Sequence, residues 1–362
     1  VERNLRFRNN EEFASIISAA YFLDYNRLYN YIVKRDGSKN IDVAIVGNNN
    51  ISKTFFSFIF AAVNLKDVNL NITFYDKNPN KFYQELICEN PLLTETAVIS
   101  VNGKVKVNKI NDEITDIAYA NIDFKSSKER IDQSYILILD KTGYDYYHMA
   151  DGLYHEFKND PQKRIILNYS RNNHEVDIRQ EGNISFYNLD LASTSTYRNR
   201  EFSDKILDEA FEIFRLYVLN SFGERSDNFN AWKYFIKDDF YNLKSSLRVA
   251  LSIEYYKFMV GLESAADPAD KFYKEVVNIE DDKGINTRDI LADYEHQSWN
   301  RFMIVLGYKV PSRKELRSYA YIDKKGYIDF QNKYNPFIAN CNIGSVSYTH
   351  LRAHETRHDL VC

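Results

Sequence analysis

Residues 40–64 read NIDVAIVGNNNISKTFFSFIFAAVN, and this stretch decides the fold prediction for the chain. Residues 41–46 form a short apolar run rich in β-branched side chains, which predicts one buried strand. Gly47 ends the run, and an apolar helix is predicted from Ser52 to about Leu65. A strand, a tight polar turn and a helix are the start of a βαβ unit, whose helix N-terminus offers free N–H groups to a phosphate.

The turn matches the dinucleotide-binding fingerprint G-x-G-x-x-G in part. Gly47, Asn49 and Ser52 occupy the three glycine positions. Asparagine tolerates left-handed backbone conformations and serine is small, so the turn remains feasible without the second and third glycines. These three residues are therefore candidates for binding NAD or another adenine nucleotide.

Two further loops are expected at the same edge of the sheet. Asp76 follows a predicted strand at residues 71–75, where a dinucleotide-binding fold has an acid that binds ribose hydroxyls. A solvated turn acid is an equally good interpretation of Asp76. Asp140 and Thr142 follow the apolar run at residues 135–139, and in an open α/β sheet their loop lies across the crevice from the glycine turn.

The strand–helix alternation predicts an α/β fold with a doubly wound sheet over residues 41–222. A helical segment at residues 1–40 precedes it. Asn102-Gly103 is a strong hairpin signal and marks an insertion or an extension of the sheet. The other predicted elements are helices at 81–89, 146–157 and 203–220, strands at 164–169 and 184–187, and hairpin strands at 97–101 and 104–107.

The remainder of the chain is predicted to be helical and aromatic. Helices are expected at 230–241, 243–261 and 287–306, and Gly307 stands where a helix C-terminus favours glycine. A second, mostly α-helical domain is therefore predicted after residue 222.

Residues 291–308, LADYEHQSWNRFMIVLGY, resemble the RyR domain, the module repeated in ryanodine receptors. The residues that match the family pattern are Leu291, Ala292, Glu295, His296, Trp299 and Gly307. Ser298 stands where the family usually has arginine, and Tyr308 replaces a tryptophan. Bacterial members often place this module behind a Rossmann-like domain similar to the regulatory nucleotide-binding domains of potassium transporters. The resemblance implies an RyR-like domain at residues 228–345 behind a Rossmann-like domain at residues 41–222.

Glu295, His296 and Trp299 are candidate ligand-binding residues in that helical domain. Glu295 and Trp299 share one helix face by their spacing, and His296 lies beside them. A carboxylate and an imidazole beside a large aromatic ring suit a small polar ligand or a purine. The alternative is that Trp299 belongs to the core and the two polar side chains bond within the domain.

Composition limits the classes of partner. The chain has 362 residues and a net charge of −4 with both signs interspersed, which argues against nucleic-acid binding and anionic membranes. The apolar run at residues 55–63 is too short to span a bilayer. Cys88, Cys341 and Cys362 have no metal or disulfide spacing, so a cytoplasmic location is expected.

The last seventeen residues, 346–362, resemble the translated read-through of a sequencing adapter. They are set aside in predicting the fold, together with the three histidines that they contain.

The sequence favours a non-enzymatic regulatory protein that senses ligands. A nucleotide would bind to the Rossmann-like domain, and a small ligand or partner to the RyR-like domain. Two alternatives stay open, namely an NAD(P)-dependent oxidoreductase and an interaction scaffold with degenerate sites. No catalytic residue and no metal site are predicted, and a homo-oligomer is compatible with the sequence.

Overall fold

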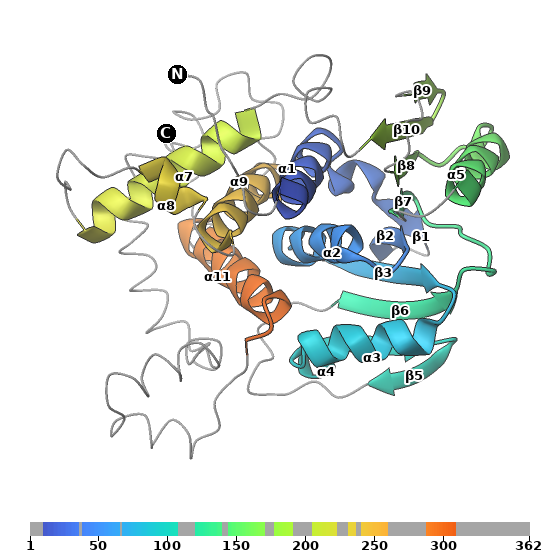
Figure 1. Ribbon diagram of the computed structural model, residues 1–362, viewed down its shortest axis with the longest axis horizontal. Coiled ribbons are helices and arrows are strands. Elements are labelled where there is room, and N and C mark those ends of the chain that lie inside the picture. The colour runs from blue at the N-terminus through green and yellow to red at the C-terminus, as the bar shows by residue number, and fades with distance from the viewer. Residues whose placement is uncertain are drawn as a thin grey trace.

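The computed structural model describes residues 10–35, 38–65, 67–107, 120–139, 144–170, 177–190, 205–222, 231–236, 240–259 and 287–308. Within these ranges, helices surround one mixed, mostly parallel sheet (Figure 1). The strands are β1 (Val33–Arg35), β2 (Ser38–Val46), β3 (Val68–Asp76), β4 (Ala97–Val101), β5 (Lys104–Val107), β6 (Ala120–Ser126), β7 (Tyr135–Ile138), β8 (Arg164–Ser170), β9 (Asp177–Glu181) and β10 (Ile184–Asp190). The helices are α1 (Asn10–Tyr25), the 3₁₀ helix η1 (Leu28–Tyr31), α2 (Asn50–Ala62), α3 (Pro79–Glu89), α4 (Leu93–Thr96), α5 (Tyr144–Phe157), α7 (Lys205–Phe222), α8 (Ala231–Phe235), α9 (Tyr241–Met259) and α11 (Thr287–Val305).

The strands lie in the order β5-β4-β6-β3-β2-β7-β8-β10-β9. Strand β2 is central and runs parallel to β3 on one side and to β7 on the other. The expected central strand is therefore confirmed, and Gly47 follows its carboxyl end. Strands β5 and β9 are antiparallel to their neighbours, as is the short β1, which pairs with the first residues of β2.

From Val43 to Val46, the side chains of the central strand alternate between two cores, so this part of the strand is buried on both faces. Val43 and Ile45 enter the larger cluster, with α1, α2, α3, α7, α9 and α11. Ala44 and Val46 enter a smaller cluster with α5. A continuous apolar run is what a parallel strand covered on both sides requires.

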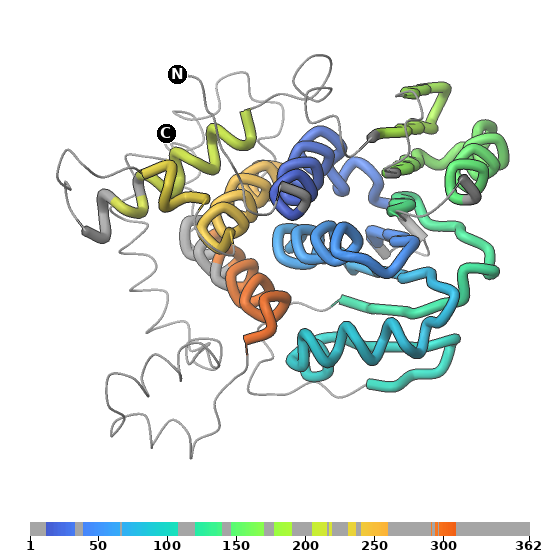
Figure 2. Tube along the Cα trace, in the orientation of Figure 1, coloured from blue at the N-terminus to red at the C-terminus, as the bar shows by residue number. Residues whose placement is uncertain are grey.

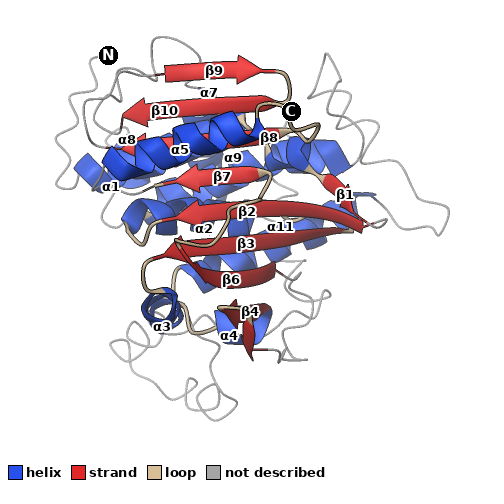
Figure 3. Ribbon diagram, turned by 90° about the vertical axis from the view of Figure 1, so that its right-hand side faces the viewer, coloured by secondary structure: helices blue, strands red, loops and turns tan. Residues whose placement is uncertain are grey.

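The face that α5 occupies carries a polar ladder toward the other end of the sheet. Helix α5 covers this face over β8 and β10 (Figure 3). Over β2, β3 and β6, the amide of Asn71 donates to Asp42 at 2.8 Å, and the amide of Asn121 donates to Asn71 at 2.8 Å. Strand β6 therefore alternates polar and apolar side chains, as a half-exposed strand does.

Helix α2 lies at the centre of the larger core. Phe55, Phe56 and Ile59 are about 1% exposed and pack between the sheet and the neighbouring helices. Burying each such side chain contributes about 1.5–3 kcal/mol. Helices α1 and α11 both contact α2, and α1 also contacts α9, as the blue and gold tubes of Figure 2 show.

Most elements expected from the sequence are present, with some differences. The hairpin of β4 and β5 has its expected bounds, and it extends the sheet because β4 pairs with β6. The sequence patterns missed β1, β6 and β9. Residues 1–40 were expected to be helical, but β1 and the start of β2 also lie there.

The larger core continues across the predicted domain boundary near residue 222. It takes Ile206 and Phe214 from α7, Leu247 from α9 and Phe302 from α11. The boundary itself stays a prediction. The adapter-like residues 346–362 lie outside the described residues.

Helix α11 ends as the glycine signal predicts. Gly307 has a φ of +80°, its N–H donates to Ile304, and the N–H of Tyr308 donates to Met303. This pair of bonds is a Schellman motif, which satisfies carbonyl groups that the helix end leaves free. A Cβ atom at Gly307 would stand 2.6 Å from the carbonyl oxygen of Glu89, at the end of α3. Glycine is therefore required here both by φ and by the close approach.

Candidate functional site

The turn after β2 needs glycine at its first position. Gly47 has a φ of +103°, in the region that favours glycine, and its N–H donates to the carbonyl of Tyr75 at 3.0 Å. This bond ties the turn to the carboxyl end of β3, where Asp76 lies. One carboxylate oxygen of Asp76 accepts the N–H of Asn78 at 2.7 Å, which is the local turn interaction expected of a turn acid. The sheet therefore brings Gly47 and Asp76 to one edge, as expected.

Asn49 is the N-cap of α2. Its Oδ1 accepts the N–H groups of Ile51 at 2.9 Å and Ser52 at 3.1 Å. Its Nδ2 donates to the carbonyl of Leu139 at 2.5 Å, so the side chain bridges the ends of β2 and β7. Ser52 is fully buried and lies under this cap. Two N–H groups that a phosphate would use at a helix N-terminus are thus occupied by Asn49 itself.

A carboxylate also stands beside this turn. The Nδ2 of Asn48 donates to Glu85 of α3 at 2.7 Å. This hydrogen bond is the main reason that the pKa of Glu85 is lowered, with Lys81 and Lys53 also favouring the charged form. A bound phosphate would therefore meet a negative charge on the α3 side of the turn.

The loop after β7, which was expected to face the glycine turn, is described only as far as Leu139. Asp140 and Thr142 lie outside the described residues, so their predicted role stays a prediction. Sequence reasoning missed a buried amide pair further along the same edge, where Asn168 of β8 donates to Asn188 of β10 at 2.7 Å. The signal was an asparagine inside an apolar strand, next to its carboxyl end.

On α11, Glu295 is held by internal partners. Both of its oxygens accept from the guanidinium of Arg248 on α9, at 2.7 and 3.1 Å, and Tyr256 donates to it at 3.1 Å. The side chains of Arg248 and Glu295 are 2% and 15% exposed. Burial would lower the pKa of Arg248, but the adjacent Glu295 carboxylate outweighs it and raises that pKa.

Ser298 takes part in the same network. It is fully buried, accepts from Arg248 at 2.7 Å and donates to the carbonyl of Ala61 in α2 at 2.8 Å. The RyR pattern has arginine at this position, and here Arg248 brings a guanidinium to it from α9. Trp299 is partly buried against the larger core, and the side chain of His296 lies outside the described residues.

A second buried arginine holds the carboxyl end of α2. Arg301 donates to the carbonyls of Phe60 at 3.2 Å and Val63 at 2.8 Å. Burial lowers the pKa of Arg301 to about 10, so the group stays charged at neutral pH. Asn64 adds a bond to Gln297 at 3.0 Å. Cations stabilise a helix C-terminus because of the helix dipole, and α11 therefore caps α2.

The described residues show neither a cluster of metal ligands nor a helix that could cross a membrane. Among them, no three His, Cys, Asp or Glu side chains gather as metal ligands would. None of the helices in the described ranges has both the length and the hydrophobicity that crossing a bilayer requires. Comparison with known proteins adds no relative, because no family model matches the chain and no curated protein or solved structure is significantly similar to it.

Proposed function

We propose that the chain is a non-enzymatic regulatory protein, in which a Rossmann-like portion binds a nucleotide at the turn after β2 and an RyR-like helical portion binds a small ligand or partner. The strand order supports the Rossmann-like part. In chain order β2, β3, β6, β7, β8 and β10 are six mutually parallel strands, and in space they lie 3-2-1-4-5-6. That is the order of dinucleotide-binding folds, whose ligands bind where the strand order reverses, here between β2 and β7.

The observation that carries the regulatory part is the position of α2. Its N-terminus begins at the turn, where Asn49 caps it, and its C-terminal carbonyls accept from Ser298 and Arg301 of α11. A nucleotide that displaces the Asn49 cap would act directly on α2, whose other end is hydrogen-bonded to the RyR-like helix. A ligand shifts such an equilibrium by its difference in affinity for the two arrangements, usually about 1–3 kcal/mol.

The test uses the two tryptophans of the chain. Trp232→Phe leaves Trp299 of α11 as the reporter, and the protein is titrated with NAD, ATP and ADP. We expect thermal stabilisation, about 2.7 kcal/mol at a ligand concentration of 100 times Kd, together with a saturable change in Trp299 emission. Trp299→Phe, which keeps Trp232 on α8, is the control and should lose most of the response.

Each of the other outcomes selects another function. Stabilisation without a Trp299 response would mean binding without regulation of α11. Oxidation of NAD(P)H with a carbonyl substrate would favour the oxidoreductase. No effect of any nucleotide would favour the scaffold. This alternative is supported by the cap of α2, because Asn49 already occupies the N–H groups of Ile51 and Ser52.

Asn49→Gly is expected to strengthen nucleotide binding. Glycine as N-cap costs the helix only a few tenths of a kcal/mol, and the bond from Asn49 to the Leu139 carbonyl is lost as well. The change releases the N–H groups of Ile51 and Ser52 to a phosphate. One added charge-assisted hydrogen bond of about 1.5 kcal/mol would raise the affinity for ATP about tenfold. Asn78→Gly, which changes the cap of α3, is the matched control. Weaker ATP binding by Asn49→Gly would contradict this expectation and make Asn49 a ligand contact.

A further inference from the structure

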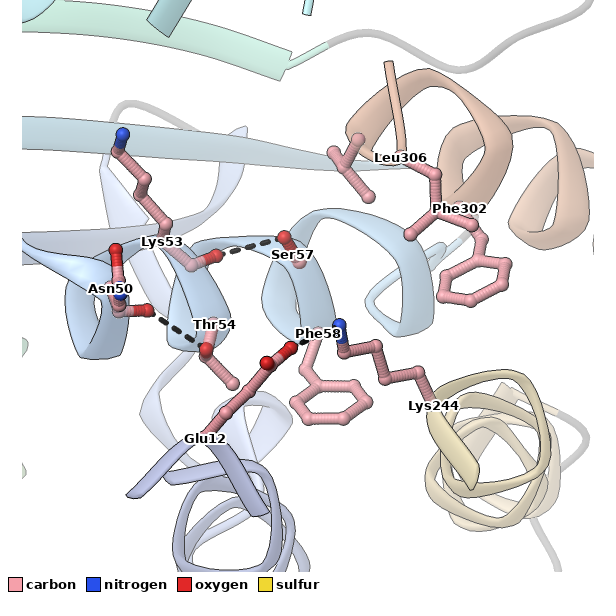
Figure 4. Close-up of a pocket in the computed structure, with 10 residues that line it drawn as sticks. Glu12, Asn50, Lys53, Thr54, Ser57, Phe58, Lys244, Phe302 and Leu306 are labelled. Atoms are coloured by element: carbon pink, nitrogen blue, oxygen red, sulfur yellow. Dashed lines mark hydrogen bonds and ion pairs between the residues drawn. The ribbon is translucent and has the colours of Figure 1, made fainter. Parts of the chain in front are cut away.

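A pocket of about 300 Å³ lies along the exposed side of α2, between α1, α9 and α11 (Figure 4). Its volume is at the lower end of the range for small-molecule sites. Its walls come from four helices that are far apart in the sequence. The lining residues are Glu12, Asn50, Lys53, Thr54, Ser57, Phe58, Lys244, Phe302, Val305 and Leu306.

One part of the pocket is apolar and firmly held. Phe58 and Phe302 are 3% and 2% exposed, and both belong to the larger core. Val305 and Leu306 continue this wall along the last turn of α11. Because these side chains come from two packed helices, the wall is present before any ligand binds. A ring or branched alkyl group matches it by burying apolar area.

The polar part of the pocket is rich in hydrogen-bond donors. Lys53 pairs with Glu89 at 2.5 Å, and Lys244 pairs with Glu12 at 2.9 Å. An ammonium group has three donors, so one carboxylate oxygen leaves further donors for a ligand. Together the two lysines and their partners Glu89 and Glu12 carry no net charge, so an anion would be bound by the ammonium donors that remain and not by an excess of positive charge.

The two hydroxyl groups add acceptors rather than donors. Thr54 donates to the carbonyl of Asn50 and Ser57 to that of Lys53, both at 2.8 Å. Their protons are used within α2, and only oxygen lone pairs face the pocket. The donors that remain for a ligand are therefore the two ammonium groups and the side-chain amide of Asn50, and the charged ammonium groups favour an anion.

We propose that this pocket binds a small organic anion with an apolar body, of the aryl or branched-alkyl carboxylate class. The inference rests on the proposed function, because it assigns a binding site and a chemical class to the small ligand that was proposed there for the helical portion. The apolar body lies against Phe58 and Phe302, and the carboxylate lies at the ammonium of Lys244. For a ligand of about ten non-hydrogen atoms, the dissociation constant is on the order of 1 mM.

Three probes that share a phenyl ring test the charge preference. The full chain is titrated with phenylacetate, phenylacetamide and phenethylamine, and binding is followed by ligand-observed NMR. We expect phenylacetate to bind at least ten times more tightly than the amine, with the neutral amide between them. Equal affinities for the three probes, or no binding of phenylacetate at tens of millimolar, would overturn the proposal.

Two variants locate the site. Lys244→Gln is expected to weaken phenylacetate binding about tenfold, whereas Lys205→Gln, which removes a lysine paired with Glu209 on α7, should leave it unchanged. Ser57→Leu keeps both lysines and fills the pocket, and binding should be lost while the circular dichroism spectrum stays that of the parent. Undiminished binding by Ser57→Leu would place the ligand elsewhere and refute the assignment.

Nucleotide stabilisation is measured on the same samples, so that the two proposals can fail separately. Loss of the phenylacetate effect with nucleotide binding intact defeats the pocket alone. Phenylacetate binding that depends on Lys244, with no nucleotide effect, keeps the pocket and defeats the nucleotide site.

Discussion

Glu295→Ala should lower the free energy of unfolding by about 3–5 kcal/mol. The change removes the carboxylate that both NH groups of Arg248 contact, and it leaves a guanidinium that is 2% exposed without its counter-charge. An unpaired buried charge costs far more than the pair contributed, because its desolvation is no longer offset. Urea unfolding, followed by circular dichroism, measures the effect.

Glu212→Ala is the matched control for this change. Glu212 pairs with Arg215 on the exposed side of α7, where both side chains are about half exposed, and such pairs contribute about 0–1 kcal/mol. Arg248→Met combined with Glu295→Leu should recover part of the loss, since no charge is then buried. A cost below about 1 kcal/mol for Glu295→Ala would show that the pair is solvated, and Glu295 would then be available to a ligand.

Gly307→Ala is expected to cost about 2–5 kcal/mol, which combines left-handed backbone strain with steric overlap. The new Cβ would stand 2.6 Å from the carbonyl oxygen of Glu89, so α11 or the end of α3 has to move. Gly103→Ala is a close control, because its φ is +70° but nothing lies within 4 Å of its Cβ position. That variant should lose only about 1–2 kcal/mol.

The difference between the two glycine variants, measured by urea unfolding, isolates the contact between α11 and α3. Equal losses would mean that α11 does not approach Glu89 so closely. In that event the Schellman motif alone would account for Gly307.

The sequence predicts the buried strands well and the half-exposed strand poorly. Strand β7 and the part of β2 from Val43 to Val46 are continuous apolar runs because both faces are covered there. In strand β6, the buried residues Ala120, Ile122 and Phe124 alternate with polar residues, which lie on the face of the polar ladder. A search for continuous runs misses such a strand, although its period of two is regular.

The candidate sites were predicted less completely, for a physical reason. The positions of Gly47, Asn49 and Asp76 follow from local order along the chain, because parallel strands end at one edge. Arg248 and Arg301 are buried only because α2 and α11 supply partners more than forty residues away. A single sequence gives no sign that an arginine in an amphipathic helix points inward rather than outward, so the sequence predicts no buried role for either residue.

The pairing of the N-terminal helices α1 and η1 with α9 also sets an order of events during synthesis. The N–H of Leu28 donates to the hydroxyl of Tyr255, 227 residues later, and Lys244 of α9 binds Glu12 of α1. At ~5–20 residues per second, a ribosome needs roughly 11–45 s to make the intervening chain. Throughout that interval Ile16, Ala20 and Leu23 lack the α9 part of their final surroundings. The part of α1 that α9 covers therefore stays exposed for many seconds, which is a period of exposure to chaperones that a domain with local contacts does not have.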